Sequence, residues 1–137
     1  MYSTLKDRDV VLMEKGSIMF NNLNRGDIIS FKQKTSGNRM VFFIKRIIGV
    51  PGDTVEIKDG KVYVNEDLIT EDYLQKDLAT LTPDGENLRV LLDEDQYFVL
   101  GDNRNNSVDS RFEEVGIVTK EQIVSKRVIT LFNLPNF

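Results

Sequence analysis

Lys45 is chemically unusual because it lies inside a run of apolar residues. Residues 39–48 read RMVFFIKRII, and the two-residue period of a strand places Lys45 on one face and Arg46 on the other. One possibility is that both side chains extend their charges into water along their apolar stems. The other is that Lys45 is withdrawn from water, which would lower its pKa and let its amine act as a general base near neutral pH.

A second group of reactive residue types follows the strand predicted over residues 96–100. Residues 101–111 read GDNRNNSVDSR and contain two Asp, two Arg and two Ser. Such a composition is typical of a surface loop. However, the alternation of Asp102, Arg104, Asp109 and Arg111 would let carboxylate–guanidinium pairs fix the shape of the loop and present Ser107 at a defined place.

The composition limits which reactions these residues could support. The chain of 137 residues contains no histidine, cysteine or tryptophan. A Ser-His-Asp triad, a thiol nucleophile, a disulfide and a zinc site of His or Cys ligands are therefore excluded. Catalysis would have to use Ser, Thr, Lys, Tyr or carboxylate side chains, and we expect no metal and no cofactor. The net charge of −4 argues against nucleic acid as a partner, because phosphate binding needs a clustered positive face.

The elements that must position these residues are mostly strands. Short runs rich in β-branched and aromatic residues predict strands at 10–13, 27–31, 39–48, 54–57, 61–64, 96–100 and 126–132. Asp59-Gly60 lies between two of them and predicts a tight hairpin, because both residues accept positive φ. Residues 49–53, GVPGD, predict a sharp turn that shapes the chain and does not react.

Helical signals are few. Thr119 is a candidate N-cap for one turn over residues 119–123, and residues 85–95 are ambiguous. Residues 66–95 are the most polar stretch and are interpreted as a loop-rich insertion. We therefore predict a single, mainly β domain over residues 1–137, built from folded antiparallel sheets or a barrel with little helix. No window approaches the roughly 18 to 20 apolar residues that span a bilayer, so the sequence as given predicts a soluble domain.

Four segments of this sequence resemble the signature boxes of the type I signal peptidases, the serine–lysine proteases of the bacterial cell membrane. Residues 45–53, KRIIGVPGD, and residues 101–111 are similar to the two longest boxes. Residues 25–31, RGDIISF, and residues 1–5, MYSTL, are similar to two shorter ones. The segments occur in the order of the family and span nearly the whole chain. The resemblance implies the signal peptidase fold, a cell-membrane location on the extracytoplasmic face, and a single-pass anchor.

The resemblance also implies a role for each matching residue. Lys45 would be the general base, and Ser107 would hydrogen-bond to its amine and orient it. Two ion pairs would support the site, one between Arg46 and Asp102 and one between Asp109 and Arg111. The positions that line the apolar pockets of the family for small substrate side chains are Met1, Leu5, Phe43 and Ile44.

The nucleophile does not appear among these residues. In the family the nucleophilic serine directly precedes the Met that matches Met1, and Ser3 occupies a proline position of the same box. Ser3 does not replace the nucleophile, since a shift of three residues displaces a side chain by roughly 10 Å along an extended strand. We therefore expect the serine, a turn that helps form the oxyanion hole and the membrane anchor to precede this sequence in the whole protein.

Four functions remain open from the sequence. The first is a membrane-associated serine endopeptidase that removes signal peptides, with small residues before the cut, from secreted preproteins. The second is a catalytically inactive assembly factor that binds preproteins or pilus subunits. The third is a self-cleaving, repressor-type serine–lysine domain, which accounts poorly for residues 101–111 and lacks a helix-rich DNA-binding half. A non-enzymatic binding module is the fourth and least specific interpretation.

Overall fold

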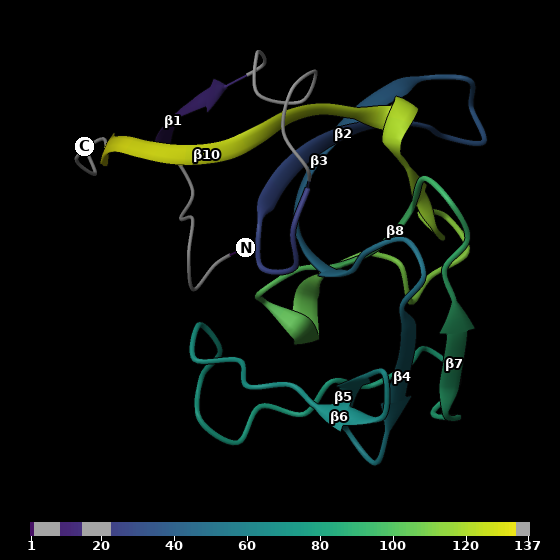
Figure 1. Ribbon diagram of the computed structural model, residues 1–137. Coiled ribbons are helices and arrows are strands. Elements are labelled where there is room, and N and C mark those ends of the chain that lie inside the picture. Colours follow the sequence, from purple (N-terminus) through teal and green to yellow (C-terminus); the bar gives the residue numbers. More distant parts are fainter. Residues whose placement is uncertain (2–8, 15–22, 134–137) are drawn as a thin grey trace.

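The chain folds into two antiparallel sheets, as a computed structural model that describes residue 1, residues 9–14 and residues 23–133 shows (Figure 1). The six-stranded sheet has the order β1-β10-β2-β3-β8-β9. Its strands are β1 (Asp9–Glu14), β2 (Ile28–Lys34), β3 (Met40–Gly49), β8 (Gln96–Leu100), β9 (Val118–Thr119) and β10 (Ile123–Asn133). The four-stranded sheet, at the bottom of Figure 1, has the order β6-β5-β4-β7. Its strands are β4 (Thr54–Lys58), β5 (Lys61–Val64), β6 (Asp67–Leu68) and β7 (Leu88–Leu91).

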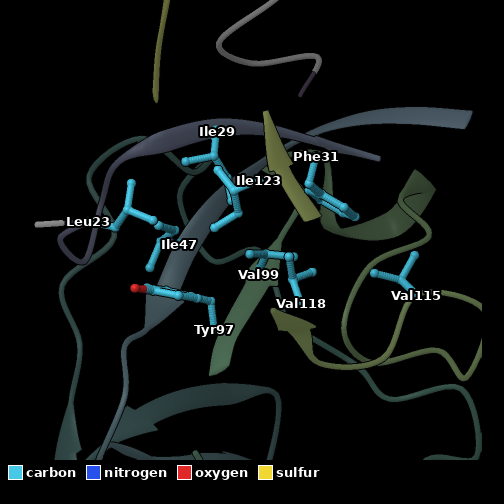
Figure 2. Close-up of a cluster of buried hydrophobic side chains, with 9 residues drawn as sticks. All are labelled: Leu23, Ile29, Phe31, Ile47, Tyr97, Val99, Val115, Val118 and Ile123. Carbon is cyan, nitrogen blue, oxygen red and sulfur yellow. The ribbon is translucent and has the colours of Figure 1, made fainter. Parts of the chain in front are cut away.

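Two hydrophobic clusters lie on opposite faces of β3 and β8, because alternate residues of a strand point to opposite faces. Ile47 and Val99 join the first cluster, whose buried side chains come from β2, β3, β8, β9 and β10 and from the loops before β2 and β9 (Figure 2). Ile48 and Phe98 join the second cluster, to which β4 and β5 of the four-stranded sheet contribute buried side chains. The two strands are therefore held on both sides, and the segments that follow them start from fixed positions.

The turn chemistry predicted from the sequence is present. Asp59 and Gly60 have φ values of 51° and 73° and join β4 to β5, where Lys58 pairs with Lys61. Residues 50–53 connect β3 to β4, and the carboxylate of Asp53 accepts a hydrogen bond of 3.0 Å from the amide of Val50. The expectation of a mainly β, antiparallel fold is confirmed.

Two segments were candidates for helix in the sequence, and the structure has a helical turn in only one of them. Thr119 caps the single turn η3 (Lys120–Gln122) with a capping box, as expected. Residues 85–95, ambiguous in the sequence, contain the strand β7, which pairs with β4. Residues 66–95 therefore consist of loops with two short strands, β6 and β7, that extend the four-stranded sheet on either side of the β4–β5 hairpin. The other helical turn, η2 (Arg104–Asn106), lies within the polar segment that follows β8.

Candidate active site

Lys45 lies on β3 with its side chain buried, only 8% of the residue being exposed. Its Nζ donates a hydrogen bond of 3.0 Å to Ser107 Oγ and lies 5.7 Å from the centre of the Phe43 ring. Burial lowers the pKa of Lys45; the negative charge of Asp109 opposes this shift and the positive charge of Arg111 adds to it. The possibility that Lys45 extends its charge into water is therefore wrong, because β3 carries core residues on both faces here.

Gly101 explains how Ser107 comes so close to Lys45. Gly101 directly follows β8, and Ser107 folds back over it. A Cβ atom on Gly101 would lie 2.6 Å from Ser107 Cβ and 3.5 Å from Lys45 Nζ. A side chain at position 101 would occupy the space in which the Ser107 hydroxyl meets the amine. The glycine is required by this close approach, not by its backbone conformation.

Two ion pairs flank the amine, and both were implied by the resemblance. Arg46 binds Asp102 through two hydrogen bonds, of 2.9 Å from Nε and 2.8 Å from Nη2. Arg111 binds Asp109 in the same way, with Nε 2.8 Å and Nη2 2.9 Å from the carboxylate. The Asp109 carboxylate also accepts the backbone amide of Gly101 at 3.0 Å. The second pair therefore fixes the backbone at the point where Ser107 folds back.

Among the described strands, β3 lacks a partner along one edge next to Lys45. Along one side β3 pairs with β2 over the whole of residues 40–46. Along the other side, among the strands that the structure describes, β8 pairs with it only at residues 46–49. Residues 40–45 thus present main-chain groups with which an extended peptide could form strand-like hydrogen bonds.

The four residues assigned to substrate pockets are not all gathered by the structure. The Met1 sulfur accepts a hydrogen bond of 3.4 Å from the amide of Asp102, and burial together with the charge of Lys45 lowers the pKa of the Met1 amino group. Phe43 stacks on Phe31 with ring centres 5.6 Å apart, whereas Ile44 follows it and is turned to the opposite face. Leu5 lies outside the described residues.

One contact of the polar segment was not foreseen in the sequence. Arg104 was expected to take part in pairs within residues 101–111, but its guanidinium binds Glu71, 33 residues away. Tyr73 and Thr80 belong to the same cluster. No local pattern marks these three residues, since they come from the polar stretch interpreted as an insertion.

Within residues 23–126 and Met1, whose side chains are described, no group of three or more His, Cys, Asp or Glu residues could hold a metal ion. A hollow of about 640 Å³ lies between residues 82–88 and 111–114 and includes neither Lys45 nor Ser107. None of the helical segments described is long and apolar enough to cross a membrane.

Comparisons with known proteins identify the family of this chain. The family model of the signal peptidases, peptidase S26, matches residues 1–132, and the chain belongs to this family. It is 37% identical over 138 residues to probable signal peptidase I-2 of Synechocystis, covering 98% of this chain and 60% of that protein. It is 38% identical over 141 residues to signal peptidase I S of Bacillus subtilis, covering 97% of this chain and 73% of that protein.

The fold is also similar to a solved structure. The crystal structure of a signal peptidase I from Enterococcus faecalis superposes with a TM-score of 0.59 at 30% sequence identity, covering 77% of this chain and 96% of that one. The chain spans 60% of the length of the Synechocystis relative.

Proposed function

We propose that this chain is the extracytoplasmic catalytic domain of a serine endopeptidase that removes signal peptides from secreted preproteins, with Lys45 as the general base. The observation that carries the proposal is the buried Lys45 amine, 3.0 Å from Ser107 Oγ and beside the open edge of β3. A desolvated amine with a lowered pKa is a suitable base, and an open strand edge is a suitable place for an extended substrate. Membership of the signal peptidase family supports the same function.

The nucleophile in this proposal is a serine that precedes Met1 in the whole protein. The charge of Lys45 lowers the pKa of the Met1 amino group, which supports a nucleophile in the neighbourhood of the Lys45 amine. Lys45 Nζ donates a hydrogen bond to Ser107 Oγ. With one N–H bond held in this way, the lone pair of the neutral amine can point toward the nucleophile. Ser107 therefore orients the base without reacting itself.

The reaction would proceed in two steps, acylation of the serine and hydrolysis of the acyl-enzyme. Lys45 takes the proton of the serine hydroxyl as the serine oxygen attacks the scissile carbonyl carbon. The C–N bond then breaks, the Lys45 ammonium gives its proton to the leaving amine, and an acyl-enzyme ester remains. In the second step Lys45 takes a proton from water, the resulting oxygen nucleophile attacks the ester, and the serine leaves with a proton returned by Lys45.

The substrates in this proposal are preproteins with small residues at the first and third positions before the cut, delivered at the membrane surface by an anchor that precedes this domain. An extended chain bonded to the edge of β3 would send alternate side chains into pockets beside Lys45. Arg46–Asp102 and Asp109–Arg111 would keep the loop in place, because breaking a buried ion pair typically costs about 3–5 kcal/mol.

The proposal is tested with the full-length protein and a preprotein that carries small residues at those two positions. Lys45→Met should abolish cleavage without unfolding the protein, since methionine keeps most of the buried apolar stem. Lys58→Met, which removes an exposed lysine from β4, is the control and should cleave like the wild type. Cleavage by Lys45→Met at the wild-type rate would show that Lys45 is not the general base. A wild-type protein that binds the preprotein or a pilus subunit without cutting it would instead indicate the assembly factor.

A further inference from the structure

A buried arginine links the segment around Ser107 to the four-stranded sheet. The side chain of Arg104, in η2, has no exposed surface. Its Nε donates a hydrogen bond of 3.0 Å to the carbonyl of Gly101, and its Nη1 donates to Thr80 Oγ1 at 2.5 Å and to Glu71 Oε2 at 3.1 Å. Its Nη2 donates to the other oxygen of the Glu71 carboxylate. Glu71 is thus the counter-ion of a guanidinium that also holds the backbone of Gly101.

The carboxylate of Glu71 is itself held by a neighbour. Tyr73 donates its hydroxyl proton to Glu71 Oε1 at 2.7 Å, and burial together with the charge of Glu71 raises the pKa of Tyr73, so the phenol stays a donor. The guanidinium of Arg46 lies 3.9 Å above the Tyr73 ring. The residues around Glu71 therefore contact both the Arg104 guanidinium and the Arg46–Asp102 pair.

The same segment is tied to the four-stranded sheet. The amide of Thr80 donates a hydrogen bond of 2.8 Å to the carbonyl of Gly60, in the β4–β5 turn. The carbonyl of Leu81 accepts one of 2.7 Å from Arg111, the partner of Asp109. The loop from Glu71 to Leu81 is therefore bonded to the β4–β5 hairpin through Thr80. It also binds the buried side chains of Arg104 and Arg111.

We propose that Glu71 is a positioning residue for the Lys45–Ser107 pair and acts through Arg104. The inference rests on the proposed peptidase function. Gly101 is the contact point, since Arg104 holds its carbonyl while Ser107 and Lys45 surround its Cα. Without the Glu71 charge, a buried guanidinium would be left uncompensated, and the Arg104 side chain would have to seek water. The Gly101 carbonyl would then lose its donor, and Ser107 would no longer be held against the amine.

The test compares two matched carboxylate-to-amide changes in the full-length protein. Glu71→Gln should lower kcat/KM for preprotein cleavage by up to about tenfold, because it would end the Ser107–Lys45 hydrogen bond, which contributes about 0.5–1.5 kcal/mol. Glu56→Gln breaks the exposed pair between Glu56 and Arg89 in the four-stranded sheet and should leave the rate unchanged.

The pH profile separates positioning from a merely structural role. Among the described residues, the charges that face Lys45 in the full-length protein are those of Asp109, Arg111 and Asp102. If Ser107 moves away and water reaches the amine, the pKa of Lys45 rises toward its ordinary value. The rising limb of the profile, in which the base loses its proton, should then shift to higher pH in Glu71→Gln and stay in place in Glu56→Gln.

Variants of Arg104 and Tyr73 test whether Glu71 acts through Arg104. Adding Glu71→Gln to Arg104→Met should produce no further fall in kcat/KM, and additive losses would show that Glu71 does not act through Arg104. If Glu71→Gln is unfolded by circular dichroism, Tyr73→Phe decides instead, with a severalfold loss and the same direction of pH shift expected. A folded Glu71→Gln, or failing that a Tyr73→Phe, with the wild-type rate and pH profile overturns the inference.

The outcome for Lys45→Met distinguishes this inference from the function on which it rests. An inactive Lys45→Met beside a Glu71→Gln of wild-type behaviour would remove the positioning role and leave the peptidase function intact. A Lys45→Met that cleaves like the wild type would remove both, because there would be no catalytic amine for Glu71 to position.

Discussion

Gly101→Ala is the smallest change that should separate Ser107 from Lys45. The added methyl group would overlap Ser107 Oγ and lie 2.6 Å from Ser107 Cβ, whereas non-bonded carbon atoms prefer about 3.5–4.0 Å. Ser107 must therefore move by about 1 Å. Because Nζ and Oγ are now 3.0 Å apart, a movement of that size along their line ends the hydrogen bond. The backbone at position 101 does not have positive φ, so the effect is steric and not conformational.

The expected magnitudes follow from this displacement. Inserting a methyl group into a packed site typically destabilises a protein by about 1–3 kcal/mol. Ending the Ser107–Lys45 hydrogen bond, which contributes about 0.5–1.5 kcal/mol, should lower the rate by up to about tenfold. Activity should therefore fall by more than the loss of folded protein explains, since a domain of ordinary stability, about 5–15 kcal/mol, would stay almost entirely folded.

The assay is preprotein cleavage beside denaturant unfolding of the same samples. Gly37→Ala is the control, because position 37 has ordinary φ and a Cβ there would meet only Thr35 Oγ1 at 3.9 Å. The double variant Gly101→Ala/Ser107→Gly removes the Ser107 side chain and should recover much of the stability without recovering the rate. A Gly101→Ala protein with wild-type cleavage would refute the view that the space between Gly101, Ser107 and Lys45 sets the activity.

Ser107→Ala should lower kcat about tenfold, because it removes one net hydrogen bond of about 0.5–1.5 kcal/mol while keeping the base; an unchanged kcat in the cleavage assay would show that the hydroxyl is idle. Asp53 governs part of the stability toward acid. Burial raises its pKa, but hydrogen bonds from Arg25, the Val50 amide and Asn65 outweigh this and hold the pKa below its usual range. The stabilisation is therefore present above the unfolded value of about 3.9 and is lost as the pH falls through the lower folded value. Denaturant unfolding between about pH 5 and 2 should show a shallower loss of stability for Asp53→Asn than for the wild type, and equal slopes would contradict the assignment.

Local patterns were sufficient to predict most of the fold. The alternation within residues 54–64 and the Asp59-Gly60 dipeptide determine a hairpin whose pairing involves only neighbouring residues. The strand β7 was harder to predict, because its burial alternates weakly and its partner β4 lies more than 30 residues away. Two short strands that depend on an existing sheet edge leave little local signal, so residues 66–95 resembled a loop.

The candidate site was partly visible for a different reason. Lys45 among apolar residues violates the usual pattern of a strand, and such a violation indicates either a functional group or a position near water. Only the structure decides between them, because the pKa of Lys45 depends on burial and on the charges of Asp109 and Arg111, which lie more than 60 residues away in the sequence. Glu71 escaped notice for the same reason, since nothing in its own segment identifies Arg104 as its partner.

The proposed peptidase function requires that the Lys45 amine is buried away from water in the folded protein. The direct measurement is an NMR titration of protein labelled with ¹³C at the ε carbon of lysine, with Lys45→Met used to assign the signal. One signal, absent from the variant, should titrate below the exposed lysines and below the ordinary value of about 10.4. A Lys45 signal that titrates together with the exposed lysines would contradict the account.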